Sequence, residues 1–238
     1  MTATDEDKAR LDSAVKPYDG FFTTFFVSPY SKYIARWAAR RGLTPNQVTL
    51  FSMFLGVLAA AAFGTGERWG LIAGALLLQA AFTFDCVDGQ LARYTRNFSA
   101  FGAWLDSVFD RGKEYLVYAG LAVGSTRGFG VDVWPLAAAA LTLQTVRHMF
   151  DFSYTDWREE TLGAVEPTPV GFSRELDRNP VTKWAKRIVV LPIGERFATI
   201  SITAALWAPR TTFGVLLIWG GVAAIYSLSS RVLRTIVS

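Results

Sequence analysis

Apolar residues in this chain gather into six long blocks that polar stretches separate. Within a block they do not keep to one helical face, and no segment alternates with the period of two that a half-buried strand shows. Most blocks approach the roughly 20 residues that cross a hydrocarbon core about 30 Å thick. We therefore expect an all-α fold, a polytopic membrane bundle of six transmembrane helices. The expected spans are residues 47–66, 68–84, 102–124, 133–150, 186–207 and 212–229.

A helix on the membrane surface is expected before the first span. Between Tyr30 and Arg41, aromatic and aliphatic side chains fall on one side and basic side chains fall elsewhere. An N-terminal interfacial amphipathic helix has this pattern, and an ordinary solvated helix packed on the protein is the alternative. We expect residues 1–20 to be loosely attached.

Helix start signals mark the boundary between this segment and the bundle. Thr44 is a good N-cap residue, Pro45 suits the first helical position, and Gln47 follows the cap by three residues. We therefore expect an N-terminal cytosolic segment and a transmembrane domain that holds all six spans. The two parts are residues 1–43 and 44–238.

The placement of charge predicts an orientation. With the N-terminus in the cytosol, the outer loops hold only Arg68, Arg127 and Arg210, and the other basic residues fall on the inner side. The long polar insertion over residues 151–187 is then cytosolic and has room for a short amphipathic helix. The net charge of +4 suits anionic lipid headgroups, and the basic residues do not form the single soluble face that a nucleic acid would need.

Four aspartates interrupt the apolar pattern with helical spacing. Asp85 and Asp88 are one turn apart on one helix, and Asp106 and Asp110 are one turn apart on the next. The short connection lets the two pairs face each other at the cytosolic end of the bundle. Two unit charges 4 Å apart repel by about 4 kcal/mol at an effective dielectric of 20, so such a group calls for cations. Oxygen ligands favour Mg²⁺, Mn²⁺ or Ca²⁺, and we expect Mg²⁺ (or Mn²⁺), as two ions.

Small and basic residues accompany the aspartates. Gly89 and Ala92 lie beside the first pair, and Gly102 precedes the second pair by one turn, which leaves room for a ligand. Arg93 places a permanent cation at the same rim, where it suits a phosphate group. Metal, arginine and free space together indicate a diphosphate substrate.

From Asp85 to Asp110 the sequence reads D-x2-D-G-x2-A-R-x8-G-x3-D-x3-D. It resembles the motif of the CDP-alcohol phosphotransferase family at all eight defining positions. The resemblance implies transfer of a phosphoalcohol group from a CDP-linked donor to a hydroxyl acceptor, with release of CMP. It also implies metal binding by the aspartates, with Asp110 a fourth ligand or the general base. The implied CDP-binding residues are Asn46, Thr49, Asp85, Asp88, Gly89, Ala92, Arg93 and Gly102.

The acceptor and the donor are less constrained. Asp110 lies deepest of the four in its apolar span, which suits it to act as the base in a direct in-line displacement. We expect Arg147, His148 and Arg196 to form an acceptor pocket, for instance for a phosphate-bearing polyol. Two alternatives remain: the arginines reach for headgroups or pair with Glu195, and the histidine is structural.

Two donor arrangements are open. The preferred one has CDP-diacylglycerol as the donor, so that a phosphatidyl group moves to a polar acceptor in phospholipid biosynthesis. In the other, a soluble CDP-alcohol such as CDP-inositol donates to a lipid or polyol-phosphate acceptor. An intramembrane prenyltransferase would carry two separate aspartate-rich motifs instead of one. An ion-coupled transporter, the non-enzyme alternative, would place its acids near the bilayer midplane between related halves.

Composition adds weaker expectations. The single Cys86 excludes an intramolecular disulfide. Pairs of glycines four residues apart, at 70/74 and 120/124, permit close helix contact within or between protomers, which is compatible with a homodimer. The richness in alanine, arginine and glycine hints at a bacterial plasma membrane.

Overall fold

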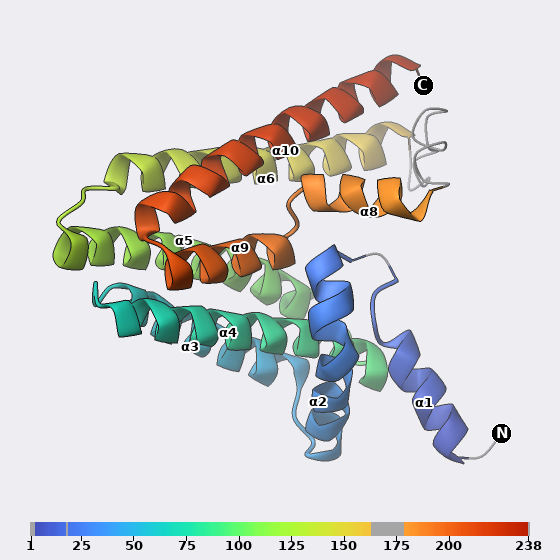
Figure 1. The fold of residues 1–238 in the computed structure, drawn as a ribbon. Coiled ribbons are helices and arrows are strands. Elements are labelled where there is room, and N and C mark those ends of the chain that lie inside the picture. Colours follow the sequence, from blue (N-terminus) through green and yellow to red (C-terminus); the bar gives the residue numbers. More distant parts are fainter. Residues whose placement is uncertain (1–2, 18, 163–178, 238) are drawn as a thin grey trace.

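The computed structural model describes residues 3–17, 19–162 and 179–237, and all regular structure within them is helical (Figure 1), which confirms the all-α prediction. The elements are α1 (Ala3–Ser13), a π-helical turn η1 (Thr23–Val27), α2 (Ser28–Arg40), α3 (Pro45–Phe63), α4 (Arg68–Thr95), α5 (Ala100–Phe129), α6 (Trp134–Leu162), α8 (Pro180–Val189), α9 (Ile193–Leu206) and α10 (Pro209–Val237). Most of the predicted insertion falls either in α6 and α8 or in residues 163–178, which lie outside the described residues.

Each of the six predicted spans coincides with a long helix, except that the fifth is broken. The stretch expected to run unbroken over residues 186–207 divides into α8 and α9, which meet at an angle of 70°. Leu191 takes a left-handed backbone conformation with φ 52, and Pro192 supplies no backbone N–H to continue the first helix. The prediction of one continuous helix there was wrong.

Three of the described helices, α3, α4 and α10, are long and apolar enough to cross a membrane. The bent pair α8–α9 adds a fourth span if it is taken as one. α5 and α6 are equally long, but α5 carries ionisable residues along its first half. Helix length and composition therefore indicate a membrane protein without fixing the number of spans at six.

α3 packs against both α4 and α5, and glycines bring α5 very close to it. A Cβ atom on Gly120 would lie 2.2 Å from the carbonyl oxygen of Ala60, and one on Gly124 would lie 2.0 Å from that of Phe63. Only a residue without a side chain allows this approach. The predicted glycine pair on α5 thus serves a contact within one protomer and lends no support to a homodimer.

The N-terminal residues are held by ion pairs. Asp7 of α1 pairs with Arg36 of α2, and Lys32 lies 2.5 Å from Asp12. Leu11 of α1 is buried. The expectation that residues 1–20 are loosely attached is therefore wrong for residues 3–17, because charge pairing between α1 and α2 fixes a segment whose own hydropathy is low.

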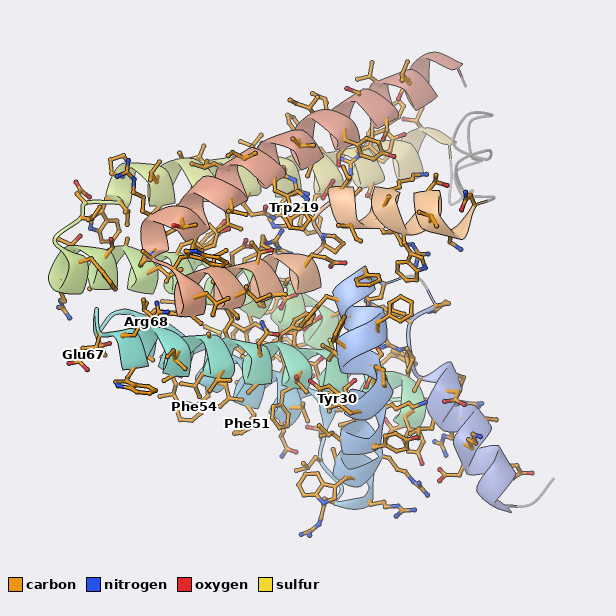
Figure 2. All side chains as sticks on the ribbon, in the orientation of Figure 1. Tyr30, Phe51, Phe54, Glu67, Arg68 and Trp219 are labelled. Carbon is orange, nitrogen blue, oxygen red and sulfur yellow. The ribbon has the colours of Figure 1, made fainter. Side chains whose placement is uncertain are left out.

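The helix predicted before the first span is α2. Ser31, Ala35 and Ala38 form its inner face, whereas Tyr33 and Trp37 are 56% and 52% exposed. On α3, Phe51 and Phe54 likewise point away from the bundle (Figure 2). Exposed aromatic side chains of this kind suit an apolar or interfacial environment, as the amphipathic prediction requires.

Candidate metal and nucleotide site

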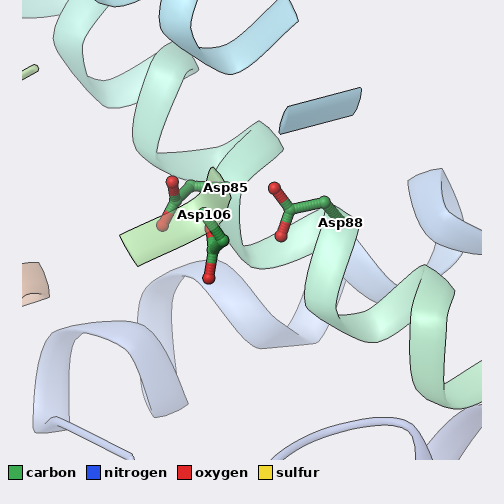
Figure 3. Close-up of side chains that lie close together, drawn as sticks. All are labelled: Asp85, Asp88 and Asp106. Atoms are coloured by element: carbon green, nitrogen blue, oxygen red, sulfur yellow. The ribbon is translucent and has the colours of Figure 1, made fainter. Parts of the chain in front are cut away.

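Three aspartates meet where α4 ends and α5 begins. Asp85 and Asp88 lie one turn apart on α4, and Asp106 lies in the second turn of α5. One carboxylate oxygen from each lies within 4.8 Å of the other two. Figure 3 shows the three carboxylates around a common space. The structure thus brings these residues together as the helical spacing predicted.

A short, well-defined turn positions the two helices. α4 ends at Thr95, and its C-cap residue Arg96 has a left-handed φ of 57. α5 starts after Ser99, whose hydroxyl accepts a hydrogen bond of 2.9 Å from the Gly102 amide. Residues 96–99 therefore reverse the chain immediately after the first aspartate pair. Because the turn is short, the residue of α5 that faces this pair lies in the second turn of that helix, and that residue is Asp106.

α3 supplies a partner for Asp88. The capping box of Thr44 and Gln47 starts α3 at Pro45, as the sequence predicted. One turn later, the Thr49 hydroxyl donates a 2.7 Å hydrogen bond to Oδ2 of Asp88, a residue only 4% exposed. Thr49 therefore helps to orient this buried carboxylate.

Asp106 provides the test of whether a cation fits. Its Oδ1 atom is buried and has no hydrogen-bond partner among the described residues. A buried carboxylate oxygen without a partner is costly, and a bound cation removes that cost. Because the converging donors are all carboxylate oxygens, they suit a hard divalent ion such as Mg²⁺ or Mn²⁺.

Asp110, predicted as a fourth ligand, has a different neighbour. Its Oδ1 lies 3.1 Å from Nζ of Lys113, which also forms an ion pair with Asp85. Lys113 donates a further hydrogen bond of 2.9 Å to the Ser52 hydroxyl. The sequence reasoning missed Lys113, although a Lys-Glu pair inside a predicted span was a usable signal, because ionisable residues there are functional candidates.

A first pocket lies on the side of the aspartates that faces α3 and the α4–α5 turn. A Cβ atom on Gly102 would lie 2.7 Å from Oδ1 of Asn46, so the missing side chain allows these two helix starts to approach. Seven of the predicted CDP-binding residues line this pocket, and Asp85 is the exception. They are Asn46, Thr49, Asp88, Gly89, Ala92, Arg93 and Gly102.

A second pocket lies under the N-terminal segment. It shares Asp88, Gly89, Arg93 and Asp106 with the first pocket but is otherwise lined by other elements. Those further lining residues are Lys16, Asp19, Thr23, Ser28, Phe82, Asp85, Cys86, Gln90, Asp110 and Ile193. Three buried atoms of this set have no hydrogen-bond partner among the described residues: Oγ1 of Thr23, Oε1 of Gln90 and Oδ1 of Asp110. The second pocket therefore offers unused hydrogen-bonding capacity.

The N-terminal segment closes over the shared rim. Nε of Arg93 donates to the carbonyl oxygen of Ala14 at 2.5 Å, and Arg10 donates to that of Tyr94 at 2.7 Å. Gly20 lies so close to Glu195 of α9 that a Cβ atom would lie 2.3 Å from its Oε2. Residues 3–20, apart from the undescribed residue 18, thus form part of the site.

Two of the three predicted acceptor residues, Arg196 and His148, contact a buried carboxylate that is not one of the four aspartates. Nε of Arg196 lies 2.7 Å from Oε1 of Glu114, whose side chain is fully buried. His148 lies 3.8 Å from the same carboxylate, and Arg147 donates to the carbonyl of Val190 at 2.6 Å. None of the three is among the residues that line the two pockets. Arg196 pairs with Glu114, not with the neighbouring glutamate that the sequence offered as an alternative.

With this geometry established, comparison with known proteins identifies the class. The model of the CDP-alcohol phosphatidyltransferase family matches residues 42–227, so the chain belongs to that family. It is therefore a membrane-embedded transferase of phospholipid biosynthesis that acts on CDP-linked donors. This identification confirms the resemblance carried by the aspartate motif, and it removes the transporter and prenyltransferase alternatives.

Two relatives illustrate the similarity. The chain is 29% identical to the phosphatidylinositol phosphate synthase of Mycolicibacterium smegmatis over 203 residues, which are 85% of this chain and 82% of the relative. It is also 29% identical to the archaetidylinositol phosphate synthase of Pyrococcus horikoshii over 175 residues, 74% and 81% of the two chains.

A solved relative has the same fold. The phosphatidylinositol phosphate synthase of Mycobacterium tuberculosis has been crystallised with CDP-DAG bound and in complex with manganese and citrate. The two structures match with TM-scores of 0.52 and 0.54 at 24% identity. The first comparison covers 86% of this chain and 91% of the solved one, and the second covers 84% and 88%.

Proposed function

We propose that the chain transfers a phosphatidyl group from CDP-diacylglycerol to a hydroxyl of a polar, phosphorylated polyol and releases CMP. The observation that carries this proposal is the position of the aspartates between two pockets. The first holds the residues implied in CDP binding, and the second holds Asp110 and unpartnered polar atoms. A two-substrate transfer needs this arrangement, because donor and acceptor must meet at one phosphorus atom.

Three observations support CDP-diacylglycerol as the donor. One relative is named a phosphatidylinositol phosphate synthase and another an archaetidylinositol phosphate synthase, and the solved one holds CDP-DAG. Arg93 lines both pockets and can pair with a diphosphate oxygen. Phe98 and Phe101 beside the first pocket are 68% and 61% exposed, which offers acyl chains an apolar surface.

Asp85, Asp88 and Asp106 would hold the divalent ion, Mg²⁺ or Mn²⁺. When bound, such an ion neutralises the diphosphate and makes CMP a better leaving group. Thr49 keeps the Asp88 carboxylate in place for this task, and Asp106 contributes an oxygen that has no other partner.

Asp110 is proposed as the general base. It lines the second pocket but not the first, so it faces the acceptor side. It would take the proton of the acceptor hydroxyl as the oxygen forms its bond to phosphorus and the bond from phosphorus to CMP breaks. General-base assistance of this kind contributes about 10²–10⁴-fold to a rate.

The acceptor role of Arg147, His148 and Arg196 remains a prediction. Arg196 and His148 contact Glu114, which lies one helical turn beyond Asp110 along α5, and Arg147 donates to the carbonyl of Val190. We propose that they raise acceptor affinity. If Arg196→Ala left the acceptor KM and the turnover number unchanged, this role would be excluded.

The proposed setting is a bacterial plasma membrane, crossed six times by α3, α4, α5, α6, α9 and α10. The site would lie at the cytosolic end together with residues 1–43, and two chains would form a homodimer through surfaces outside the α3–α5 glycine contact. The distribution of basic residues supports this orientation.

A reconstituted assay tests the function. The full chain in nanodiscs receives CDP-diacylglycerol with or without Mg²⁺ or Mn²⁺, and inositol phosphate, glycerol phosphate or serine as the acceptor. We expect metal-dependent CMP release together with a phosphatidylated product, and loss of both in Asp110→Asn. Asp132→Asn, which alters a carboxylate in the remote α5–α6 turn, is the matched control.

A second arm supplies CDP-inositol with lipid or polyol-phosphate acceptors. CMP release only in that arm would replace the proposed donor with a soluble CDP-alcohol. No CMP release in either arm would overturn the proposed function.

A further inference from the structure

A buried lysine lies inside the carboxylate site. Nζ of Lys113 forms an ion pair with Asp85, lies 3.1 Å from Oδ1 of Asp110 and donates a 2.9 Å hydrogen bond to Ser52. Its side chain is fully buried, with 0% exposure. A lysine in this position brings a fixed positive charge to the aspartates before any metal binds.

The neighbouring helix is shaped to receive this side chain. A Cβ atom on Gly56 of α3 would lie 2.7 Å from Cγ of Lys113 and 3.1 Å from Cδ, so the glycine makes room for the lysine stem. The Ser52 hydroxyl donates to the carbonyl oxygen of Ala81 at 2.9 Å, which leaves its oxygen free to accept from the ammonium group. Lys113 therefore occupies a built site with a defined partner at each end.

The lysine also divides the four aspartates. Asp85, Asp88 and Asp106 converge closely enough to share one ion, and Asp110 is not part of that group. A second ion that linked Asp85 to Asp110 would need the place between them, where the ammonium group lies. The ammonium group and a cation held between the same two carboxylates would repel each other, so the lysine disfavours a second cation there.

We propose that the ammonium group of Lys113 replaces the second divalent cation, so that the site binds one ion, held by Asp85, Asp88 and Asp106. This inference rests on the proposed function and departs from the two ions that the sequence suggested. Lys113 is then a positioning residue. It holds Asp110 as a carboxylate that no metal coordinates, which leaves Asp110 available to the acceptor hydroxyl.

Mn²⁺ binding tests the proposal without nucleotide and independently of turnover. The full chain in nanodiscs is titrated with Mn²⁺ by calorimetry and by electron paramagnetic resonance. We expect one ion per chain and the six-line spectrum of an isolated Mn²⁺. Lys113→Met keeps the length of the side chain and removes its charge, so we expect two ions and the signal of a spin-coupled pair. Lys32→Met, which removes a surface lysine paired with α1, should leave the single ion unchanged.

Two ions in the wild-type chain, or one ion in both the wild-type chain and Lys113→Met, would overturn the proposal. If Lys113→Met did not fold, the wild-type spectrum would still decide, because a spin-coupled pair contradicts the proposal and an isolated ion supports it. CMP release from CDP-diacylglycerol is measured on the same sample. Two ions with CMP release would refute the lysine's role alone, whereas one ion without CMP release from any CDP-linked donor would refute the proposed function.

Discussion

The four aspartates are chemically identical, but their surroundings differ, and Asp85 forms an ion pair with Lys113. Asp88 accepts a hydrogen bond from Thr49, Asp106 has a buried oxygen without a partner, and Asp110 faces Lys113. The same substitution should therefore have different effects on metal binding and turnover at Asp88, Asp106 and Asp110.

Substitution of two of these aspartates by asparagine should therefore separate metal binding from base catalysis. Asp106→Asn removes a ligand charge and should weaken Mn²⁺ binding at least tenfold, whereas Asp110→Asn should keep Mn²⁺ affinity and lower kcat by about 10²–10⁴-fold. Calorimetric titration and CMP release measure the two effects, with Asp132→Asn as the control. Equal losses of Mn²⁺ affinity in the two variants would show that Asp110 is a ligand.

The close approach of Gly102 to Asn46 predicts a donor-specific effect. In Gly102→Ala the new Cβ atom would lie 2.7 Å from Oδ1 of Asn46 and 2.8 Å from Oγ of Ser99, so these two side chains of the first pocket must shift. We expect KM for the CDP-linked donor to rise roughly ten- to hundredfold, with the acceptor KM unchanged. Gly214→Ala on α10, whose Cβ would meet no atom within 4 Å, is the matched control. If the acceptor KM rose instead, Asn46 would contact the acceptor, and its predicted role in binding the CDP-linked donor would be wrong.

Much of this residue-scale detail could be predicted from the sequence, because the motif is local. Helical spacing and a short turn suffice to bring Asp85, Asp88 and Asp106 together, and no tertiary knowledge is needed. The pairing of Asp110 with Lys113 also follows from spacing, because the two residues are three apart on α5. The reach of Lys113 to Asp85 and Ser52 could not be predicted in this way, because it depends on the room that Gly56 leaves on another helix.

At the scale of elements, the N-terminal helix depends on charge, unlike the bundle. The Tyr94 hydroxyl donates a 2.6 Å hydrogen bond to Asp7, and together with the charge of Arg36 it holds the pKa of Asp7 below its ordinary value of 3.8. The pKa of Asp12 is also lowered, by its contact with Lys32. α1 is thus fastened across the rim of the site by two carboxylates.

The docking of α1 should consequently weaken in acid. Because the pKa of Asp7 is lower in the folded chain than in the unfolded one, its contribution is present above pH 3.8 and is lost as the pH falls through the lowered value. A spin label at Ser13→Cys should become mobile in that range. In the variant Asp7→Asn, the spin label should already be more mobile at pH 7. The change in mobility that remains on acidification should then come from Asp12 alone. An unchanged label in both chains would show that these ion pairs do not hold the helix.

Hydropathy anticipated the long helices, because each apolar block is itself the helix, but it did not anticipate α1 or the bend. α1 has few apolar residues, and its position comes from pairs with residues of α2 and α4 that lie far along the chain. The bend at Leu191 and Pro192 had a local signal in the proline, yet mean hydropathy across residues 186–207 averages that signal away.

At the scale of the whole molecule, the aspartates and the N-terminal helices share one end of the bundle, and the α5–α6 turn lies at the other (Figure 1). This polarity makes the orientation testable. In intact cells an impermeant maleimide should label Asp132→Cys, and it should label Ser13→Cys only after permeabilisation. The wild-type chain, with Cys86 alone, gives the background. The opposite labelling would invert the proposed topology and place the site outside the cytosol.

The two pockets that share Asp88 and Asp106 have a stereochemical consequence. In the proposed mechanism, a nucleophile that enters from the Asp110 side would attack phosphorus opposite the departing nucleotide, without a covalent intermediate on the protein. A donor made chiral at the transferred phosphorus by sulfur substitution should therefore give a product of inverted handedness. Retained handedness would reveal two successive displacements, and hence a covalent intermediate on a side chain of the protein.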